Sequence, residues 1–239
     1  MFLLTRPLPK LNTSTQAFLD AGINVTGVAT SDIHYHEHAC EQVIERLLSR
    51  PVDAIIVTSV YAVPACIKSL KTTNKAPTVF AVGTTTAALL NEAFPSLRVL
   101  TPSQHTSEGI LAMHQVNEAN CKEVVIIKGE GGRNTLQYTL EKNGKTVTPF
   151  CVYKRKQLAT PVYTKNWKLE DVSGIIATSE NMAMQLIASH STHILTLPWV
   201  TVSERIARTL KNYNVANVAV CERATDQALI AWVKDNWEY

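Results

Sequence analysis

Loops rich in Ser, Thr, Gly and Arg follow most of the short apolar runs in this 239-residue chain. Each loop leads into a helical pattern, and the N-terminus of a helix attracts anions through its free N–H groups and its dipole. Hydroxyl groups add donors, and Arg and Lys pair with carboxylates or phosphates. The set predicts a site for a ligand with several such groups. The loops are Thr5-Arg6, Thr58-Ser59, Gly83 to Thr86, Thr106-Ser107, Lys128 to Arg133, Thr178-Ser179, Thr201 to Arg205 and Arg223 to Thr225.

A simpler interpretation holds for each loop taken alone, because Ser and Thr are common N-caps of helices. The predicted anion site depends on the collection of loops and not on any one of them. The sequence does not identify the anion.

The sequence does not match the common motifs of nucleotide-binding, hydrolytic or metal sites. The segment Gly129 to Arg133 lacks the third spaced glycine of a dinucleotide fingerprint, and the chain has neither a Walker A motif nor a nucleophile elbow. Alternating histidines in His34 to His38 would share one face of a strand. Their polar surroundings favour a solvated connector, so we predict no metal site.

The bulk composition indicates a globular protein. Apolar residues make up 46% and charged residues 18%, and the net charge of +3 is too small to indicate a nucleic-acid partner. No apolar run is long enough to span a membrane, and the start does not resemble a signal peptide. The five scattered cysteines are typical of reduced thiols. We therefore expect a cytoplasmic protein without nucleic-acid or membrane partners.

An internal repeat determines the predicted fold. Four kinds of strand–helix unit occur twice in the same order, most clearly in Asp53 to Ser59 and Ser173 to Ser179. The other strand pairs are Phe2 to Arg6 with Val124 to Gly129, Thr78 to Gly83 with His193 to Leu197, and Arg98 to Leu100 with Asn217 to Val220.

Apolar strands that alternate with helical patterns predict parallel sheets covered on both faces. We expect two flavodoxin-like or Rossmann-like three-layer α/β domains with five-stranded parallel sheets, and ligands beyond the carboxyl ends of the strands. The periodicity leaves open whether the domains are tandem halves, or whether one is inserted into the other with Thr30 to Glu37 and Tyr153 to Tyr163 as crossing strands.

Motifs along the whole chain resemble the uroporphyrinogen-III synthase (HemD-like) family. Each motif is weak alone, and their order and spacing make the resemblance specific. They are Leu3 to Pro7, Asp53 to Ser59, Val82 to Ala87, Thr106 to Leu111, Lys128 to Arg133, Val152 to Arg155 and Ser203 to Ala207.

The resemblance implies the inserted arrangement. One domain would comprise residues 1–33 and 160–239 and the other residues 37–153. The segments 30–37 and 153–163 would be extended connectors, with a cleft between the domains.

The resemblance also implies a lyase that acts without cofactor or metal in tetrapyrrole (haem, sirohaem or cobalamin) biosynthesis. Such an enzyme cyclises hydroxymethylbilane, a linear tetrapyrrole with eight carboxylates, to uroporphyrinogen III. Water is lost, and a spiro intermediate inverts the last ring. We expect a monomer, with transient handover of substrate from hydroxymethylbilane synthase.

Tyr153 resembles the family's tyrosine that assists departure of the substrate hydroxyl, although its position also suits a packing aromatic near a hinge. Two residues depart from the family pattern. Tyr61 stands where a small or amide residue is more usual, and Glu180 would repel substrate carboxylates unless it points away. Substrate-binding roles are predicted for Thr5, Arg6, Thr58, Ser59, Gly83, Thr86, Ser107, Lys128, Arg133, Thr178, Ser179, Ser203 and Arg205.

Two other functions stay open at this point. A two-lobed glycosyltransferase would need an aromatic and a Glu for the nucleotide sugar, and usually a longer chain. A two-lobed binding protein for an anionic small molecule would normally carry a secretion signal or a DNA-binding segment.

Overall fold

A computed structural model describes residues 1–239 except 74–76, 133, 191, 222 and 238–239. The chain divides into two compact units, each described by itself below. Unit 1 comprises Met1–Ile33 and Lys156–Tyr239, and unit 2 comprises His34–Arg155.

The strands follow one ten-stranded order, β10-β9-β8-β1-β2-β7-β6-β3-β4-β5, where five strands per sheet were expected. Unit 1 contains the part β10-β9-β8-β1-β2, whose neighbours pair in parallel. The central strands β1 and β8 are short and fully buried, as expected for a sheet covered on both faces. The strands are β1 (Phe2–Thr5), β2 (Val25–Tyr35), β8 (Gly174–Ala177), β9 (Pro198–Thr201) and β10 (Asn217–Val220).

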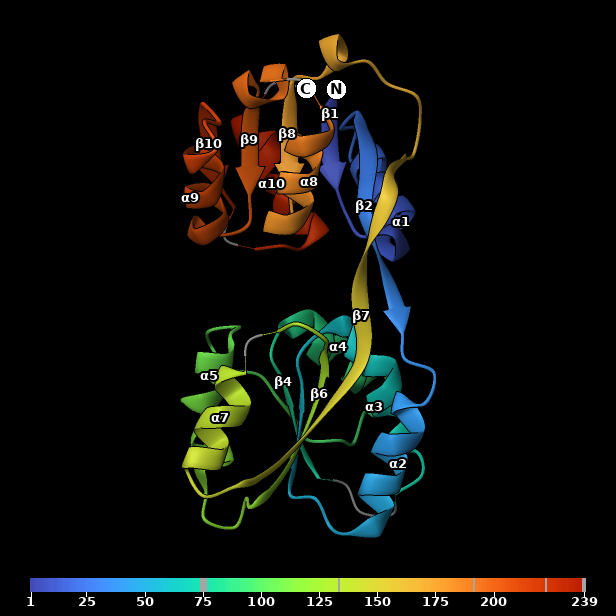
Figure 1. Cartoon of the computed structure of the whole chain (residues 1–239), viewed down its shortest axis with the longest axis vertical. Coiled ribbons are helices and arrows are strands. Elements are labelled where there is room, and N and C mark those ends of the chain that lie inside the picture. Colours follow the sequence, from blue (N-terminus) through green and yellow to red (C-terminus); the bar gives the residue numbers. More distant parts are fainter. Residues whose placement is uncertain (74–76, 133, 191, 222, 238–239) are drawn as a thin grey trace. The chain divides into compact units, whose positions relative to one another are not determined.

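Helices pack on both faces of this sheet (Figure 1). Leu3 and Ile175 pack with residues of α8 and α9, whereas Phe2, Leu4 and Ile176 pack with residues of α1 and α10. This alternation along the strands produces three layers. The helices of unit 1 are α1 (Leu8–Asp20), η2 (Leu169–Asp171), α8 (Glu180–Ser189), η3 (Thr192–Thr196), α9 (Glu204–Asn212) and α10 (Asp226–Asn236).

Unit 2 repeats this plan with the order β7-β6-β3-β4-β5, again with parallel pairing. Ile56 and Ile126 pack on the side of α5 and α7, and α2 and α3 lie on the other face (Figure 1). Its strands are β3 (Ala54–Val57), β4 (Thr78–Ala81), β5 (Val99–Leu100), β6 (Glu123–Gly129) and β7 (Thr146–Tyr163). Its helices are α2 (Ala39–Ser49), η1 (Val60–Ala62), α3 (Val63–Leu70), α4 (Thr84–Ala93), α5 (Ser107–Leu111), α6 (His114–Asn117) and α7 (Thr135–Lys142).

Two long strands contain residues of both units. β2 continues past Ile33, where unit 1 gives way to unit 2, and β7 continues past Arg155, where the chain returns to unit 1. The return is fixed within unit 1 by Thr164, whose N–H donates to the carbonyl of Gly27 at 3.1 Å.

One predicted strand is wrong. His193 to Leu197 lies largely in the 3-10 helix η3, and the strand follows as β9 from Pro198. Proline lacks an N–H group and is tolerated at the first residue of a strand. The indole N–H of Trp199 donates to the carbonyl of Ile194 at 3.0 Å, which ties the turn to the buried strand.

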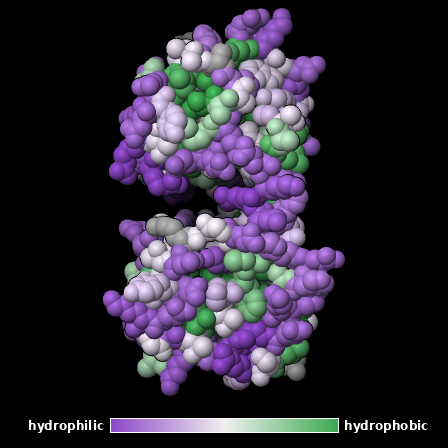
Figure 2. Space-filling view, viewed as in Figure 1, coloured by the Kyte–Doolittle hydropathy of each residue, from purple (hydrophilic) through white to green (hydrophobic). Residues whose placement is uncertain are grey.

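The surface that Figure 2 shows is mainly hydrophilic, and its hydrophobic side chains are in small groups. None of the helices in the described part of the chain combines the length and apolar content that crossing a membrane requires.

Candidate functional site

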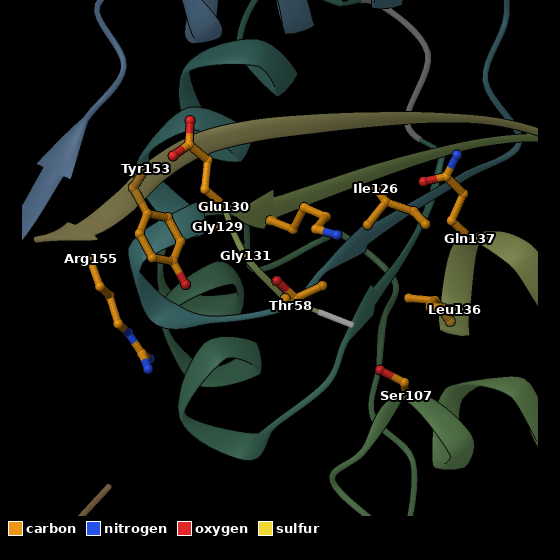
Figure 3. A pocket seen from close by; sticks show the side chains of 12 residues that line it. Thr58, Ser107, Ile126, Gly129, Glu130, Gly131, Leu136, Gln137, Tyr153 and Arg155 are labelled. Atoms are coloured by element: carbon orange, nitrogen blue, oxygen red, sulfur yellow. The ribbon is translucent and has the colours of Figure 1, made fainter. Parts of the chain in front are cut away.

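A pocket of about 360 Å³ opens in unit 2 at the carboxyl ends of β3 and β6 (Figure 3). Its walls come from the loop after β3, the start of α5, the glycine-rich loop after β6, the first turn of α7 and the middle of β7. The lining residues are Thr58, Ser107, Ile126, Lys128, Gly129, Glu130, Gly131, Gly132, Leu136, Gln137, Tyr153 and Arg155.

Two cations line the pocket. The Nζ group of Lys128 donates to the neutral Oδ1 of Asn134 at 3.0 Å, which leaves its charge uncompensated by that contact. Arg155 is exposed. The carboxylate of Glu130 lies 3.0 Å from Nε2 of His36. The lining as a whole can therefore attract an anionic ligand.

Tyr153 is the most buried of the polar side chains in the pocket, at 6% exposure. Its hydroxyl lies 2.8 Å from Oγ of Ser59, and its ring meets the ring of Tyr61 edge-on with centroids 5.5 Å apart. Burial and the neighbouring phenol of Tyr153 raise the pKa of Tyr35, so Tyr35 keeps its proton at neutral pH.

In unit 1 the predicted cations contact acids of the same unit. Arg6 is 6% exposed, pairs with the carboxylate of Asp226, and donates from Nη1 to the carbonyl of Ala224 at 3.1 Å. Ser14 donates to the other carboxylate oxygen of Asp226 at 3.0 Å. Arg205 pairs with Glu180, the acid whose position does not suit an anion site. Both guanidinium groups thus have a structural use.

The predicted hydroxyls of unit 1 are also engaged. The hydroxyl of Thr178 donates to the carbonyl of Thr5 at 2.6 Å, and the Thr178 N–H donates to the Thr5 hydroxyl at 3.0 Å. Ser179 caps α8 by accepting from Met182, and Ser203 caps α9 by accepting from Ile206. These contacts are the ordinary capping and loop-pairing uses of Ser and Thr.

The remaining predicted residues divide as follows. The pocket brings together Thr58, Ser107, Lys128 and Tyr153, and Ser59 reaches it through the Tyr153 hydroxyl. Gly83 is the N-cap of α4, and Thr86 is buried in the first turn of that helix. Arg133 lies outside the described residues.

Sequence reasoning did not include Arg155 and Gln137 among the site residues. Arg155 follows Tyr153 by two positions on β7, and residues two apart on a strand share a face. That spacing was the available signal. Gln137 has no comparable signal in the sequence. In the described residues, no cluster of three His, Cys, Asp or Glu side chains is arranged to hold a metal ion.

The fold places the chain in a class of α/β proteins that have two units with parallel sheets, each covered on both faces. Within that class, the chain belongs to the uroporphyrinogen-III synthase HemD family, whose model matches residues 13–231. The family predicted from the sequence motifs is confirmed.

Two relatives at the sequence level are uroporphyrinogen-III synthases. The protein from Escherichia coli K12 is 27% identical over 162 residues, which are 64% of this chain and 65% of that protein. The protein from Salmonella typhimurium LT2 is 28% identical over 164 residues, which are 65% of this chain and 66% of that protein. The chain thus matches slightly less than two thirds of the length of these relatives.

Solved structures support the fold. A mutant uroporphyrinogen III synthase from the extremely thermophilic bacterium Thermus thermophilus superimposes with a TM-score of 0.60 at 13% identity, with 98% of each chain covered. The uroporphyrinogen-III synthetase from Helicobacter pylori 26695 gives a TM-score of 0.56 at 14% identity, again over 98% of both chains.

Proposed function

We propose that this chain is a uroporphyrinogen-III synthase that cyclises hydroxymethylbilane and inverts its last ring. The observation that carries the proposal is the family match, which extends over residues 13–231. The pocket of unit 2 is compatible with this substrate, because it combines cations with hydroxyl groups beside the parallel strand ends where α/β proteins bind ligands.

The substrate carries eight carboxylates on four pyrrole rings, so its binding requires N–H, O–H and cationic donors more than apolar area. Lys128 and Arg155 would pair with carboxylates, and the hydroxyls of Thr58 and Ser107 would donate to them. The volume of about 360 Å³ is too small for the whole tetrapyrrole, so we propose that this pocket holds one part of it.

The reaction begins with loss of the terminal hydroxyl. An acid donates a proton to that oxygen, the C–O bond breaks, and water leaves an azafulvene cation. The substituted carbon of the last ring attacks the methylene carbon that carried the hydroxyl, and a spiro intermediate forms. The intermediate then breaks its bond to the neighbouring bridge carbon, recloses with the ring inverted, and loses a proton to restore the aromatic pyrrole.

Without the enzyme, closure gives the uninverted isomer, so the enzyme's main task is to hold the flexible chain in one geometry. We propose Tyr153 as the group that assists departure of the hydroxyl. Its phenol lines the pocket, and a phenol keeps its proton near neutral pH, so its contribution would be assisting and not essential.

We further propose that the two units are separate domains, with residues 1–33 and 160–239 in one and 37–153 in the other. Their division of the chain agrees closely with the compact units of the structure. The oxyanion-binding role predicted for the unit 1 residues is not part of this proposal, because their side chains already have partners within unit 1.

A coupled assay tests the function. Hydroxymethylbilane is generated in situ by its synthase, this protein is added, and the oxidised uroporphyrin isomers are separated. We expect isomer III to replace isomer I. Persistence of isomer I with folded protein at high concentration would refute the proposal and favour a binding protein for an anionic molecule.

The same assay tests Tyr153. We expect Tyr153→Phe to lower kcat by about tenfold, less than the roughly hundredfold or more that an essential general acid contributes, with KM little changed. Tyr138→Phe is the matched control, because Tyr138 lies in the same unit, is 67% exposed and does not line the pocket. Equal activity of Tyr153→Phe and the control would remove Tyr153 from the mechanism.

A further inference from the structure

An irregularity in strand pairing determines where Tyr153 lies. β6 and β7 pair in register as far as Lys128 opposite Cys151, and the next pair is Gly129 opposite Tyr153. One extra residue, Val152, is therefore inserted in β7, and such a bulge redirects the side chains that follow it. The bulge brings the Tyr153 ring over the end of β6.

Gly129 leaves the space that this ring occupies. A Cβ atom at position 129 would lie 2.5 Å from Cζ and 2.8 Å from the hydroxyl oxygen of Tyr153, well inside van der Waals contact. Any other residue at this position would displace the phenol. Gly129 is thus required here for close packing against a side chain.

Ser59 holds the phenol at its polar end. Its Oγ lies 2.8 Å from the Tyr153 hydroxyl, and Tyr61 packs edge-on against the ring. Ser59 is the N-cap residue of η1, yet its side chain makes no capping hydrogen bond.

The repeat in the sequence supplies an internal comparison. Ser179 occupies the equivalent position after β8, and its hydroxyl caps α8 by accepting from the N–H of Met182. Equivalent serines in the two units therefore have different uses. The hydroxyl of Ser59 is directed to Tyr153 in place of a helix terminus.

We infer that Ser59 is a positioning residue for Tyr153, and that Gly129 and the bulge provide the space in which it acts. In this assignment Ser59 orients the phenol toward the pocket and does not itself bind substrate carboxylates. The kinetic consequences of this inference rest on the proposed function. The position of the phenol does not, because it can be measured without turnover.

A double-mutant cycle provides the kinetic test. We expect Ser59→Ala to lower kcat about fivefold, the loss typical of one hydrogen bond between neutral groups, with KM within about twofold of wild type. In the Tyr153→Phe background the same change should have less than about twofold effect, because its partner hydroxyl is already absent. Ser59→Thr should retain activity.

Ser107→Ala is the matched control. Ser107 lines the same pocket with a hydroxyl group, so its loss should raise KM by the same factor in the wild-type and Tyr153→Phe backgrounds. If Ser59→Ala behaves like Ser107→Ala, with raised KM and no coupling to Tyr153, the inference is wrong and Ser59 binds substrate.

Nitration by tetranitromethane measures the position of the phenol independently of activity. Tyr153 is 6% exposed and should react slowly in the wild type, with the exposed Tyr138 as internal standard in the same mass spectrum. Ser59→Ala and Gly129→Ala should each raise the rate at Tyr153 several-fold relative to Tyr138. Unchanged rates would overturn the inference, even if the protein makes isomer III. Absence of isomer III with raised nitration rates would refute the proposed function alone.

Discussion

The strand-end loops of the two units are similar in sequence and differ in how the structure uses them. In unit 1, Arg6 pairs with Asp226 and Arg205 with Glu180, and the serines cap helices. In unit 2, Lys128 and Arg155 line a pocket. The sequence pattern around a cation therefore does not determine whether the cation lines a pocket or pairs with an acid of the same unit.

The difference originates in acids that unit 1 places beside these cations. Asp226 begins α10 and Glu180 begins α8, so each acid lies at a helix N-terminus, where the dipole favours a negative charge. The acid then attracts the nearby guanidinium group. In unit 2, Glu130 instead contacts His36, and Lys128 donates to a neutral amide.

Arg6→Met should have the largest effect and should act on stability. Removing the buried guanidinium leaves the Asp226 carboxylate with the Ser14 hydroxyl but without its cation, so we expect the free energy of unfolding to fall by about 3 kcal/mol. Urea unfolding followed by circular dichroism measures the change. A tenfold rise in KM with unchanged stability would break the comparison, since Arg6 would then be a substrate ligand.

Lys128→Met and Arg155→Met should act on substrate binding. We expect each to raise KM by about tenfold, the loss of one charge-assisted hydrogen bond, and to change the unfolding free energy by less than about 0.5 kcal/mol. Lys154→Met is the matched control, because Lys154 is exposed on the same strand and does not line the pocket. Equal kinetics for all three variants would show that the pocket does not bind carboxylates.

Arg205→Met should change little. The Arg205 side chain is 69% exposed, and exposed ion pairs contribute less than about 1 kcal/mol. We expect KM to stay within about twofold of wild type. A strong rise in KM would mean that the unit 1 loops bind substrate after all and would remove the contrast between the units.

Lys10 gives the smallest effect and tests the charge balance near Arg6. Burial, then the charge of Arg6, lowers the pKa of Lys10 below 10.5, and Asp226 opposes the shift. Between the folded pKa and 10.5 the unfolded chain binds more protons, so this group makes stability rise with pH in that window. Lys10→Met should flatten the rise by on the order of a few tenths of a kcal/mol, because solvent screens the half-exposed group. Urea unfolding at several alkaline pH values measures the slope, and an unchanged slope would exclude Lys10 as its source.

Much of the fold was predictable because the repeat supplies each strand signal twice. Runs such as Ala54–Val57 and Gly174–Ala177 are short, apolar and followed by hydroxyl-rich loops, and both are buried strands. The prediction failed at β9, where η3 comes before the proline, and it assigned no element to the helix α2.

The candidate site was predictable only in part, because the sequence shows residue types and not their partners. Arg6 and Lys128 both follow apolar strands and are equivalent by pattern. The partner of Arg6 lies 220 residues away along the chain, and no local pattern reveals that contact. Arg155 was missed for a different reason, since the signal for it was only its spacing of two residues from Tyr153 on the same strand.

The interrupted sequence of unit 1 has a consequence for how the protein is made. Unit 2 is a continuous segment, His34–Arg155, and all of it is translated before β8 begins at Gly174. A compact continuous segment can fold during synthesis, so unit 2 can fold while β1 still awaits its partner strand β8. The strand Phe2–Thr5 is thus translated before unit 2 but completes its pairing after it, and a pause in translation before Gly174 would leave this apolar strand available to chaperones.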